Sequence, residues 1–422
     1  MSFETISVIG LGYIGLPTAA MFASRKKKVI GVDVNQVAVD TINQGKIHIV
    51  EPDLDMIVNA AVTEGYLKAV TTPEAADAFL IAVPTPFLPC NKDDIPAPDL
   101  SYIEAAAKAI APVLKKGDLV ILESTSPVGA TEKLAAWLAE ARSDLSFPQT
   151  HNDAADINIA HCPERVLPGQ VVRELVENDR VIGGMSSRCS ERSVELYKTF
   201  VLGECIVTNA RTAEMAKLTE NSSRDVQIAF ANELSVICDK LNINVWELIA
   251  LANRHPRVNI LQPGPGVGGH CIAVDPWFIV SNTPEEAQLI HTARKVNDSK
   301  PEWVINKVKV AIADFLQENP NKSIQDITIA CYGLAFKPDI DDLRESPAVY
   351  IVQQIAEMHC GQVLAVEPNV SNISEKFVKV ELVSLEQALM ESDINVLLVD
   401  HKEFKNTKIK NKIIIDTKGI WI

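Results

Sequence analysis

The chain opens with a strand, a glycine turn and a helix, and this arrangement restricts its fold more than any other part of the sequence. Glycines stand at positions 10, 12 and 15, directly after the apolar run 6–9, and an alanine-rich stretch follows. Asp33 ends the next apolar run. Glycines at this spacing permit a tight turn against a pyrophosphate, the helix N-terminus supplies N–H groups, and the acid accepts from a ribose hydroxyl. The opening therefore predicts a Rossmann-type lobe that binds a dinucleotide.

The predicted cofactor is NAD rather than NADP, because the carboxylate of Asp33 disfavours a 2′-phosphate. Thr85 and Thr125 each fall just after an apolar run that is typical of a strand. We therefore expect both threonines to line the same crevice near the nicotinamide. The predicted cofactor-binding residues are Gly10, Gly12, Tyr13, Ile14, Gly15, Asp33, Thr85 and Thr125.

The rest of the chain predicts an α/β fold with a helical middle. Strand-like runs at 78–83, 118–122 and 157–160 alternate with helical stretches at 101–114 and 131–141, which indicates a parallel sheet covered on both faces. Between 212 and about 251 the pattern is helical. Strand-like runs at 327–332, 362–366, 394–399 and 412–416, with helices at 347–358 and 384–391, predict a second, smaller doubly wound unit. We expect an N-terminal Rossmann domain (1–205), a central helical domain (206–305) and a C-terminal Rossmann-like domain (306–422).

Composition excludes several classes of protein. The formal net charge is −15, from 40 basic and 55 acidic residues, so nucleic acid is not an expected partner. Eight cysteines are spread over 422 residues without a CxxC pair, which favours reduced thiols over a disulfide framework. The N-terminus lacks the pattern of a secretory signal, and no apolar stretch reaches the roughly 18 to 20 residues that span a bilayer. We expect a cytoplasmic protein without a membrane segment.

One cysteine, Cys271, stands in unusual surroundings. It ends the segment 263–271, which is rich in glycine and proline. Backbone N–H groups in such a loop lower a thiol pKa and stabilise an oxyanion, so Cys271 is the predicted nucleophile. The competing interpretation is a zinc ion bound by His161, Cys162, His270 and Cys271. Adjacent ligands of this kind differ from the spaced pairs of zinc sites, and we predict no metal.

Two groups of polar residues are further candidates for the site. Lys217, Asn221 and Arg224 follow helical spacing and therefore share one helix face, although the charge pattern alone also fits a solvated face. Glu164 and Arg165 follow the strand at 157–160, where a general base or a substrate clamp is expected. A surface salt bridge is the alternative for this pair.

Cations in two other places suit a phosphorylated substrate. His255 and Arg257 precede the cysteine segment. Lys337 and Arg344 lie just before the helix expected at 347–358. Because a helix N-terminus favours negative charge, cations beside it predict an anionic ligand such as a diphosphate.

The combination of these motifs resembles the nucleotide-sugar 6-dehydrogenases of the UDP-glucose dehydrogenase superfamily over essentially the whole chain. The matching stretches are Gly10 to Gly15, Val83 to Pro86, Glu123 to Gly129, Glu164 to Gly169, Ala213 to Asn221, Gly266 to Asp275 and Gly333 to Pro347. The resemblance implies a four-electron oxidation of a sugar C6 alcohol to a carboxylate, with two NAD⁺ and no metal. It also implies a homodimer in which Arg257 reaches the partner's site.

The resemblance assigns roles to individual residues as well. Cys271 would capture the aldehyde as a thiohemiacetal, and the thioester formed after the second hydride leaves would be hydrolysed. Lys217 and Asn221 would stabilise the oxyanion, with Lys217 also a candidate base for the first oxidation. Glu164 and Asp275 are candidates for proton transfer or water activation. The predicted substrate contacts are Arg165, Val166, Lys217, Asn221, Arg224, His255, Arg257, Gly268, Lys337 and Arg344.

Two departures from the UDP-glucose branch bear on the substrate. Residues 165–169 replace the Phe-Leu-x-Glu-Gly that follows the acid in that branch, and residues 272–275 replace its Phe-x-Lys-Asp. Both fit the branch that acts on UDP-N-acetylhexosamines. The expected substrate is UDP-N-acetyl-D-mannosamine, with UDP-N-acetylglucosamine as the alternative, in surface-polysaccharide biosynthesis of the enterobacterial common antigen type.

Two functions of other kinds stay open. A two-electron hydroxyacid dehydrogenase of the 6-phosphogluconate type would share the first lobe and a helical lysine, but Cys271 and the second α/β lobe argue against it. A silent sensor would bind NAD or a UDP-sugar without hydride transfer. The presence of a thiol, a lysine and acids in matching motifs argues against the sensor.

Overall fold

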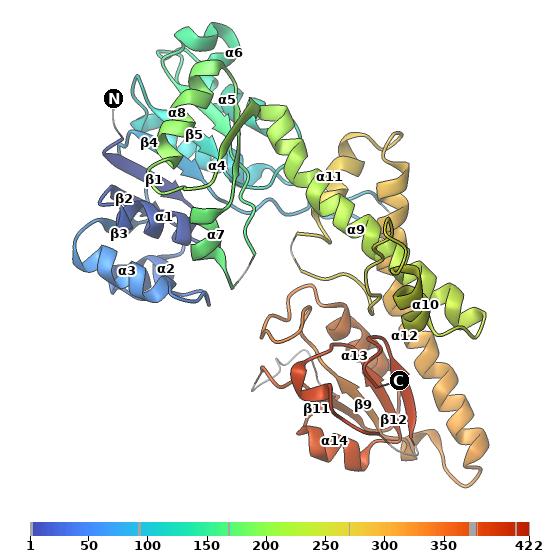
Figure 1. Cartoon of the computed structure of the whole chain (residues 1–422). Coiled ribbons are helices and arrows are strands. Elements are labelled where there is room, and N and C mark those ends of the chain that lie inside the picture. Colours follow the sequence, from blue (N-terminus) through green and yellow to red (C-terminus); the bar gives the residue numbers. More distant parts are fainter. Residues whose placement is uncertain are drawn as a thin grey trace. The chain divides into compact units, whose positions relative to one another are not determined.

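The computed structural model describes residues 3–91, 94–167, 169–269, 271–370, 377, 379–409 and 412–421. His270, one of the four residues in the zinc interpretation, lies outside the described residues. The chain divides into two compact units, residues 1–220 and 221–422 (Figure 1).

The first unit is built on an eight-stranded sheet with the order β3-β2-β1-β4-β5-β6-β7-β8. Its strands are β1 (Thr5–Ile9), β2 (Lys28–Val32), β3 (Leu67–Val70), β4 (Ala78–Ile81), β5 (Leu119–Leu122), β6 (Asn158–His161), β7 (Arg180–Gly184) and β8 (Cys205–Asn209). Its helices are α1 (Gly15–Ser24), α2 (Gln36–Asn43), α3 (Leu54–Thr63), α4 (Ser101–Ile110), α5 (Ala130–Ala141), α6 (Pro148–His151), α7 (Val171–Glu177) and α8 (Ser187–Tyr197).

Helices cover both faces of this sheet because strand side chains alternate between two apolar clusters. Ile121 of β5 packs in the cluster that contains Leu16 of α1, whereas Val120 packs in the cluster that contains Leu134 of α5. The doubly wound arrangement predicted from the sequence is therefore confirmed. One pairing differs from the expected parallel sheet: β6 and β7 run antiparallel.

The second unit begins within a long helix and ends in a five-stranded parallel sheet with the order β11-β10-β9-β12-β13. Its helices are α9 (Ala210–Lys240, which starts in the first unit), α10 (Val245–Ala252), α11 (Asp275–Asn282), α12 (Gln288–Glu318), α13 (Pro347–Met358) and α14 (Leu385–Glu391). Its strands are β9 (Ile329–Tyr332), β10 (Val363–Val366), β11 (Val380–Leu382), β12 (Ile394–Leu397) and β13 (Ile413–Asp416).

Helices α12 and α13 close one face of the second sheet. Val304 and Val308 of α12 and Ile351 of α13 share an apolar cluster with Ile329 and other residues of the sheet. The α/β class with a helical middle is thus confirmed. The sequence reasoning missed α12, a helix of 31 residues that carries Pro301 inside it, where a proline usually signals a break.

The helical stretch expected from 212 to about 251 is two helices rather than one. Asn242 takes a φ of 54°, and a residue in this left-handed region ends a helix, so α9 stops at Lys240 and α10 begins at Val245. No helix in the described part of the chain is both long and apolar enough to cross a membrane.

Candidate active site

The glycine turn of the first lobe has two glycines that the fold requires and one that it does not. Gly10 takes a φ of 90°, and a Cβ on Gly15 would lie 1.8 Å from the carbonyl oxygen of Gly10. A Cβ on Gly12 would meet no described atom within 4 Å. Helix α1, which follows, has no side-chain cap and no acid in its first turn. The space at Gly12 and the uncapped N–H groups fit a pyrophosphate.

Asp33 lies at the end of β2 with its carboxylate held by backbone donors. Its Oδ2 accepts from the N–H of Leu11 at 2.9 Å, and its Oδ1 accepts from the N–H of Asn35 at 2.9 Å. The side chain is half-buried, and each oxygen keeps a further lone pair. Asp33 therefore fits the role of a ribose acceptor.

The turns that carry Thr85 and Thr125 are joined to each other. The hydroxyl of Ser124 donates to the carbonyl oxygen of Val83 at 2.7 Å, so the segments after β4 and β5 lie side by side as expected. The Oγ1 atom of Thr85 is buried and has no hydrogen-bond partner among the described residues. An orphaned hydroxyl at this edge of the sheet fits contact with a bound cofactor.

Glu164 is tied into a buried charge cluster at the ends of β5, β6 and β7. Its Oε2 lies 2.6 Å from NH2 of Arg180, and its Oε1 accepts from the N–H of Arg165 at 2.7 Å. Arg180 lies 3.7 Å from Glu123 and stacks on the ring of Tyr197 at 4.4 Å. Burial raises the pKa of Glu123 to about 7, although Arg180 opposes the shift. Glu164 is thus a fixed buried carboxylate.

Two neighbours of Glu164 behave differently from it. The guanidinium of Arg165 lies 2.6 Å from Glu220, so Arg165 pairs with a residue of α9 and not with Glu164. Val166 packs against the apolar cluster of the first lobe.

Helix α9 carries Lys217, Asn221 and Arg224, and Glu214, one turn before Lys217, extends the same face of the helix. Lys217 and Asn221 are half-buried and Arg224 is exposed. Glu214 is 1% exposed. Leu218 is also buried, but Met215 is exposed.

Glu214 joins α9 to the cofactor side of the first lobe. Its carboxylate accepts from the N–H of Gly129 at 2.7 Å and from both the N–H and the hydroxyl of Thr131, at 2.8 and 2.6 Å. These donors are at the start of α5, just after the turn that contains Thr125. Burial raises the pKa of Glu214, with these hydrogen bonds opposing the shift. Sequence reasoning missed this residue, because a polar side chain in a helix is expected to face solvent.

The start of α11 brings together three of the predicted catalytic residues. The carbonyl oxygen of Cys271 accepts from the N–H of Asp275 at 2.8 Å. The side-chain amide of Asn221 donates to Oδ2 of Asp275 at 2.5 Å. Cys271 is exposed, whereas Asp275 is 3% exposed. The backbone of Cys271, the carboxylate of Asp275 and the side-chain amide of Asn221 on α9 are therefore linked by hydrogen bonds at the start of α11.

The glycines before Cys271 have a structural reason. A Cβ on Gly268 would lie 2.5 Å from the carbonyl oxygen of Glu345, and a Cβ on Gly266 would lie 2.9 Å from Pro347. A Cβ on Gly269 would lie 3.0 Å from the ring of Phe336. The backbone of this segment thus packs against residues 336–347. The sequence predicts that Gly268 contacts the substrate, and this packing is a second reason for a glycine at that position.

The predicted phosphate-binding cations are all exposed. His255 accepts from the N–H of Arg257 through Nδ1 at 3.3 Å. Arg344 makes a two-point pair with Asp342, with contacts of 2.9 and 2.6 Å, and Lys337 is exposed in the same segment. This segment runs into α13, which starts at Pro347.

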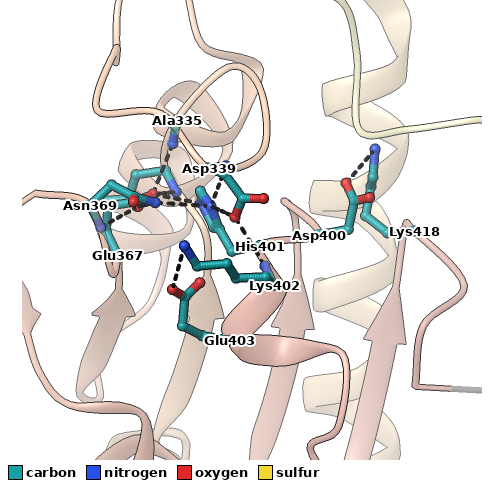
Figure 2. Close-up of polar contacts among 10 residues, drawn as sticks. Ala335, Asp339, Glu367, Asn369, Asp400, His401, Lys402, Glu403 and Lys418 are labelled. Atoms are coloured by element: carbon teal, nitrogen blue, oxygen red, sulfur yellow. Dashed lines mark hydrogen bonds and ion pairs between the residues drawn. The ribbon is translucent and has the colours of Figure 1, made fainter.

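A cluster of possible metal ligands in the second lobe is already hydrogen-bonded. Ligand atoms of Asp339, His401 and Glu403 lie within 4.8 Å of one another. Figure 2 shows that both ring nitrogens of His401 have partners: Nδ1 accepts from the N–H of Asp339 at 2.9 Å, and Nε2 faces Glu367 at 3.1 Å. Asp339 also accepts from the N–H of Lys402 at 3.0 Å. The ring therefore offers no lone pair to an ion.

Burial argues against a zinc ion at His161 and Cys162, two residues of the zinc interpretation considered from the sequence. His161 and Cys162 are fully buried, and neither ring nitrogen of His161 has a partner among the residues described. Burial lowers the pKa of His161 to about 3 and raises the pKa of Cys162 far above its usual value. A cysteine that binds zinc must be a thiolate, and the buried surroundings of Cys162 disfavour that charged form.

A dinucleotide lobe, a helical region with a cysteine and its polar neighbours, and a second Rossmann-like lobe together define a nucleotide-dependent dehydrogenase. Models of the UDP-glucose/GDP-mannose dehydrogenase family match the chain in three parts: the NAD binding domain (4–201), the central domain (211–299) and the UDP binding domain (330–422). The chain belongs to this family, and its cofactor is NAD.

Individual relatives are similar over their full length. The chain is 69% identical to the UDP-N-acetyl-D-mannosamine dehydrogenase of Yersinia pestis, over 100% of both chains. It is 63% identical to an NDP-N-acetyl-D-galactosaminuronic acid dehydrogenase of Ralstonia nicotianae, over 100% of this chain and 97% of the relative. Among solved structures, the UDP-D-ManNAc dehydrogenase of Pyrococcus horikoshii is 39% identical with a TM-score of 0.85, covering 99% of this chain and 96% of that one.

Proposed function

We propose that this chain oxidises UDP-N-acetyl-D-mannosamine at C6 to the uronate, with Cys271 as the nucleophile. The observation that carries the proposal is the hydrogen-bonded start of α11, where Asn221 donates to Asp275 and Asp275 donates to the backbone of Cys271. The 69% identity to a relative named for this substrate supports the choice of sugar. The product would be a uronic acid for a surface polysaccharide.

The first oxidation converts the C6 alcohol to an aldehyde. The space at Gly12 and the carboxylate of Asp33 would hold NAD⁺, which would supply the acceptor for the hydride lost from C6 in each oxidation. Lys217 is the proposed base for the hydroxyl proton. Its position on α9, one turn from Asn221, puts it beside the amide that would donate to the same sugar oxygen.

The second oxidation uses the thiol. Sulfur of Cys271 bonds to the aldehyde carbon while the oxygen takes a proton, which gives a thiohemiacetal stabilised by Lys217 and Asn221. Loss of a hydride and of the hydroxyl proton gives a thioester. Water, activated by Asp275 or Glu164, then breaks the carbon–sulfur bond and restores the thiol. One alcohol, one water and two NAD⁺ thus become one carboxylate, two NADH and three protons.

Product stoichiometry tests the proposal directly. Purified protein with NAD⁺ and UDP-N-acetyl-D-mannosamine should form two NADH per sugar together with the uronate. Cys271→Ser should lose complete turnover, whereas Cys360→Ser, which alters another exposed cysteine, should behave as wild type. One NADH per sugar with free aldehyde, or a fully active Cys271→Ser variant, would reject the mechanism.

A second substrate class has support from one relative. The 63% identity to a protein named for an N-acetyl-D-galactosaminuronic acid favours a test of the galacto epimer, and UDP-N-acetylglucosamine is the alternative predicted from the motifs. Comparison of kcat/KM for the manno, gluco and galacto sugars decides the assignment. The manno epimer should be preferred over both.

A homodimer is part of the proposal. Helix α9 exposes the apolar side chains of Phe230 and Ile237, which would be covered by a second copy. Arg257 would act in the partner's site. The mixed dimer of Cys271→Ser with Arg257→Ala, isolated after co-expression, should then have about half of the wild-type activity, because one of its two sites receives an intact cysteine and an intact arginine. No restoration would place Arg257 in its own subunit's site.

A further inference from the structure

Both ends of the cysteine segment are held by buried side chains of two helices. At the start of the segment, Oδ1 of Asn232 on α9 accepts from the N–H of Gly264 at 2.9 Å. At its end, NH1 of Arg294 on α12 lies 3.5 Å from the carbonyl oxygen of Ile272, the residue after Cys271. The backbone around the predicted nucleophile is therefore held from outside the segment.

The two anchors belong to one network. The amide of Asn232 donates to Oδ1 of Asn297 at 2.9 Å, and the amide of Asn297 donates to Oδ1 of Asp225 at 2.8 Å. The same Asp225 oxygen accepts from NH1 of Arg294 at 2.7 Å. All four residues are at most 1% exposed. We name this set, Asp225, Asn232, Arg294 and Asn297, the loop brace.

Stability does not account for the loop brace. A buried ion pair recovers little more than the cost of removing its charges from water, and apolar residues of similar size often serve as well. Burial raises the pKa of Asp225, with Arg294 opposing the shift. Oδ2 of Asp225 and Nε of Arg294 are buried and lack a hydrogen-bond partner in the described part of the chain. A polar network with unsatisfied atoms indicates a role other than stabilisation.

The segment itself explains what that role is. Glycine permits many backbone conformations, so a segment with glycines at 264, 266, 268 and 269 has little preference of its own. Its middle packs on Phe336 and Pro347, which leaves the two ends to be held by hydrogen bonds. A nucleophile must stay close to its reactive position, because a displacement of about 1 Å from that position costs about 100-fold in rate.

We propose that the loop brace is a set of positioning residues that holds the backbone at Gly264 and Ile272, and through it Cys271, in the geometry required for the second oxidation. This inference rests on the proposed role of Cys271. The first oxidation needs no thiol, so a loosened segment affects the two oxidations unequally.

Three variants test the loop brace against a matched control. Asn232→Ala removes the first anchor, Arg294→Met removes the second, and Arg294→Lys keeps the charge in a milder change. The control is Asp239→Asn, which breaks the 2.5 Å ion pair with Lys307 between the same two helices but away from the segment. Each full-length variant is examined by hydrogen–deuterium exchange of peptides covering the segment, and by steady-state kinetics with an aldehyde trap.

The expected result separates positioning from folding. Amides of the segment should exchange about 10-fold faster or more in Asn232→Ala and Arg294→Met. The kcat for complete oxidation should fall about 10- to 100-fold while the KM for NAD⁺ stays within about two-fold, and trapped aldehyde should increase. Arg294→Lys should recover part of the loss, and Asp239→Asn should match wild type in every measurement.

Three results would overturn the proposal. The first is hydrogen exchange in the segment that stays at the wild-type rate. The second is faster exchange with an unchanged kcat. The third is an equal loss of rate in both oxidations, which a smaller fraction of folded protein would produce. If Arg294→Met does not fold, Asn232→Ala and Arg294→Lys decide the matter. A fully active Cys271→Ser variant is a different failure, because it rejects the proposed function while the exchange of the segment stays that of wild type.

Discussion

The first turn of the N-terminal lobe and the first turn of the C-terminal lobe have the same backbone. Gly10 and Gly333 both take a φ of 90°, and each donates its N–H to the neighbouring strand at 2.8 Å. In each lobe the N–H of the next residue donates to an acid after the second strand. That acid is Asp33, at 2.9 Å, in the first lobe and Glu367, at 2.7 Å, in the second.

The two acids differ in what surrounds them. Asp33 is half-buried, with only backbone donors to its carboxylate among the hydrogen bonds described. The side chain of Glu367 is fully buried, and His401 and the N–H of Ala335 contact the same oxygen at 3.1 and 3.0 Å (Figure 2). One turn leaves its acid available to a ligand, and the other uses its acid to hold its own loop. The two turns therefore share their hydrogen bond to an acid but differ in how many other groups that acid contacts.

The largest expected effect is on stability in the C-terminal lobe. Glu367→Ala leaves His401 and several backbone N–H groups buried without an acceptor, so it should lower the free energy of unfolding by about 3 to 5 kcal/mol. Asp33→Ala should cost less than about 1 kcal/mol, because Asp33 is half-buried and water can occupy the place of its carboxylate. Urea unfolding of the full chain measures both. Equal losses would contradict the comparison.

The next effect is on cofactor affinity. Asp33→Asn keeps an acceptor for Leu11 but loses the charged partner of the ribose, which should raise the Kd for NAD⁺ by about 10- to 100-fold. Glu367→Gln should leave this Kd within about two-fold, because it alters the other lobe. Isothermal titration supplies the numbers. An Asp33→Asn protein that binds NAD⁺ as wild type does would remove Asp33 from the site.

Two glycine substitutions should give smaller effects, one on stability and the other on NAD⁺ affinity. Gly333→Ala places a Cβ 2.4 Å from Val399 at a positive φ, so it should lose about 1 to 3 kcal/mol of stability with little change in NAD⁺ affinity. Gly12→Ala adds a methyl group where the fold is open. It should leave the free energy of unfolding unchanged and raise the Kd for NAD⁺ about ten-fold, because the added methyl group would overlap the cofactor and cost about 1.4 kcal/mol of binding free energy. The reverse pattern would show that Gly12 serves the fold.

The smallest effect is a difference in pH dependence between two buried acids. Burial acts to raise the pKa of Glu367, but hydrogen bonds, led by that from His401, outweigh it and the pKa lies below the usual 4.5. The stability it adds is complete above about pH 4.5 and is lost as the pH falls through the folded value. Glu123, with a pKa raised to about 7, holds a proton that the unfolded chain has lost, so stability declines as the pH rises from about 4.5 to about 7.

Variants separate these two slopes. Glu123→Gln should flatten the decline between about pH 4.5 and 7, and Glu367→Gln should flatten the loss below about pH 4.5. Hydrogen exchange of peptides from β5 and β10, followed across the pH range after correction for intrinsic exchange, reports on each lobe separately. Unaltered slopes in both variants would show that other groups control the pH dependence.

The sequence predicted those elements whose backbone is set by a few neighbouring residues. The glycine turn before α1 and the acid after β2 stand where spacing put them, and the helix expected at 347–358 is α13, Pro347–Met358. In these places a short pattern specifies its own backbone, either through glycine at positive φ or through a proline at the start of a helix.

What the sequence could not supply are the partners of buried polar side chains. Arg294 meets Asp225 from a different helix, and Glu164 meets Arg180 from a different strand. Periodicity assigns such residues to the surface, because polarity by itself does not say which partner lies opposite. Met215 of α9 shows the reverse case, because its apolar side chain is exposed.

The carboxylate of Glu214 also limits how this protein can be divided. An N-terminal lobe cut at residue 205 would keep α5 but lose the acceptor for the N–H groups of Gly129 and Thr131. The lobe would then have unpaired N–H donors at the start of α5, so residue 205 is not a suitable boundary for moving this lobe into another chain. Any recombined chain must carry the first turns of α9 along with the lobe, and a functional fragment should extend at least through Glu214.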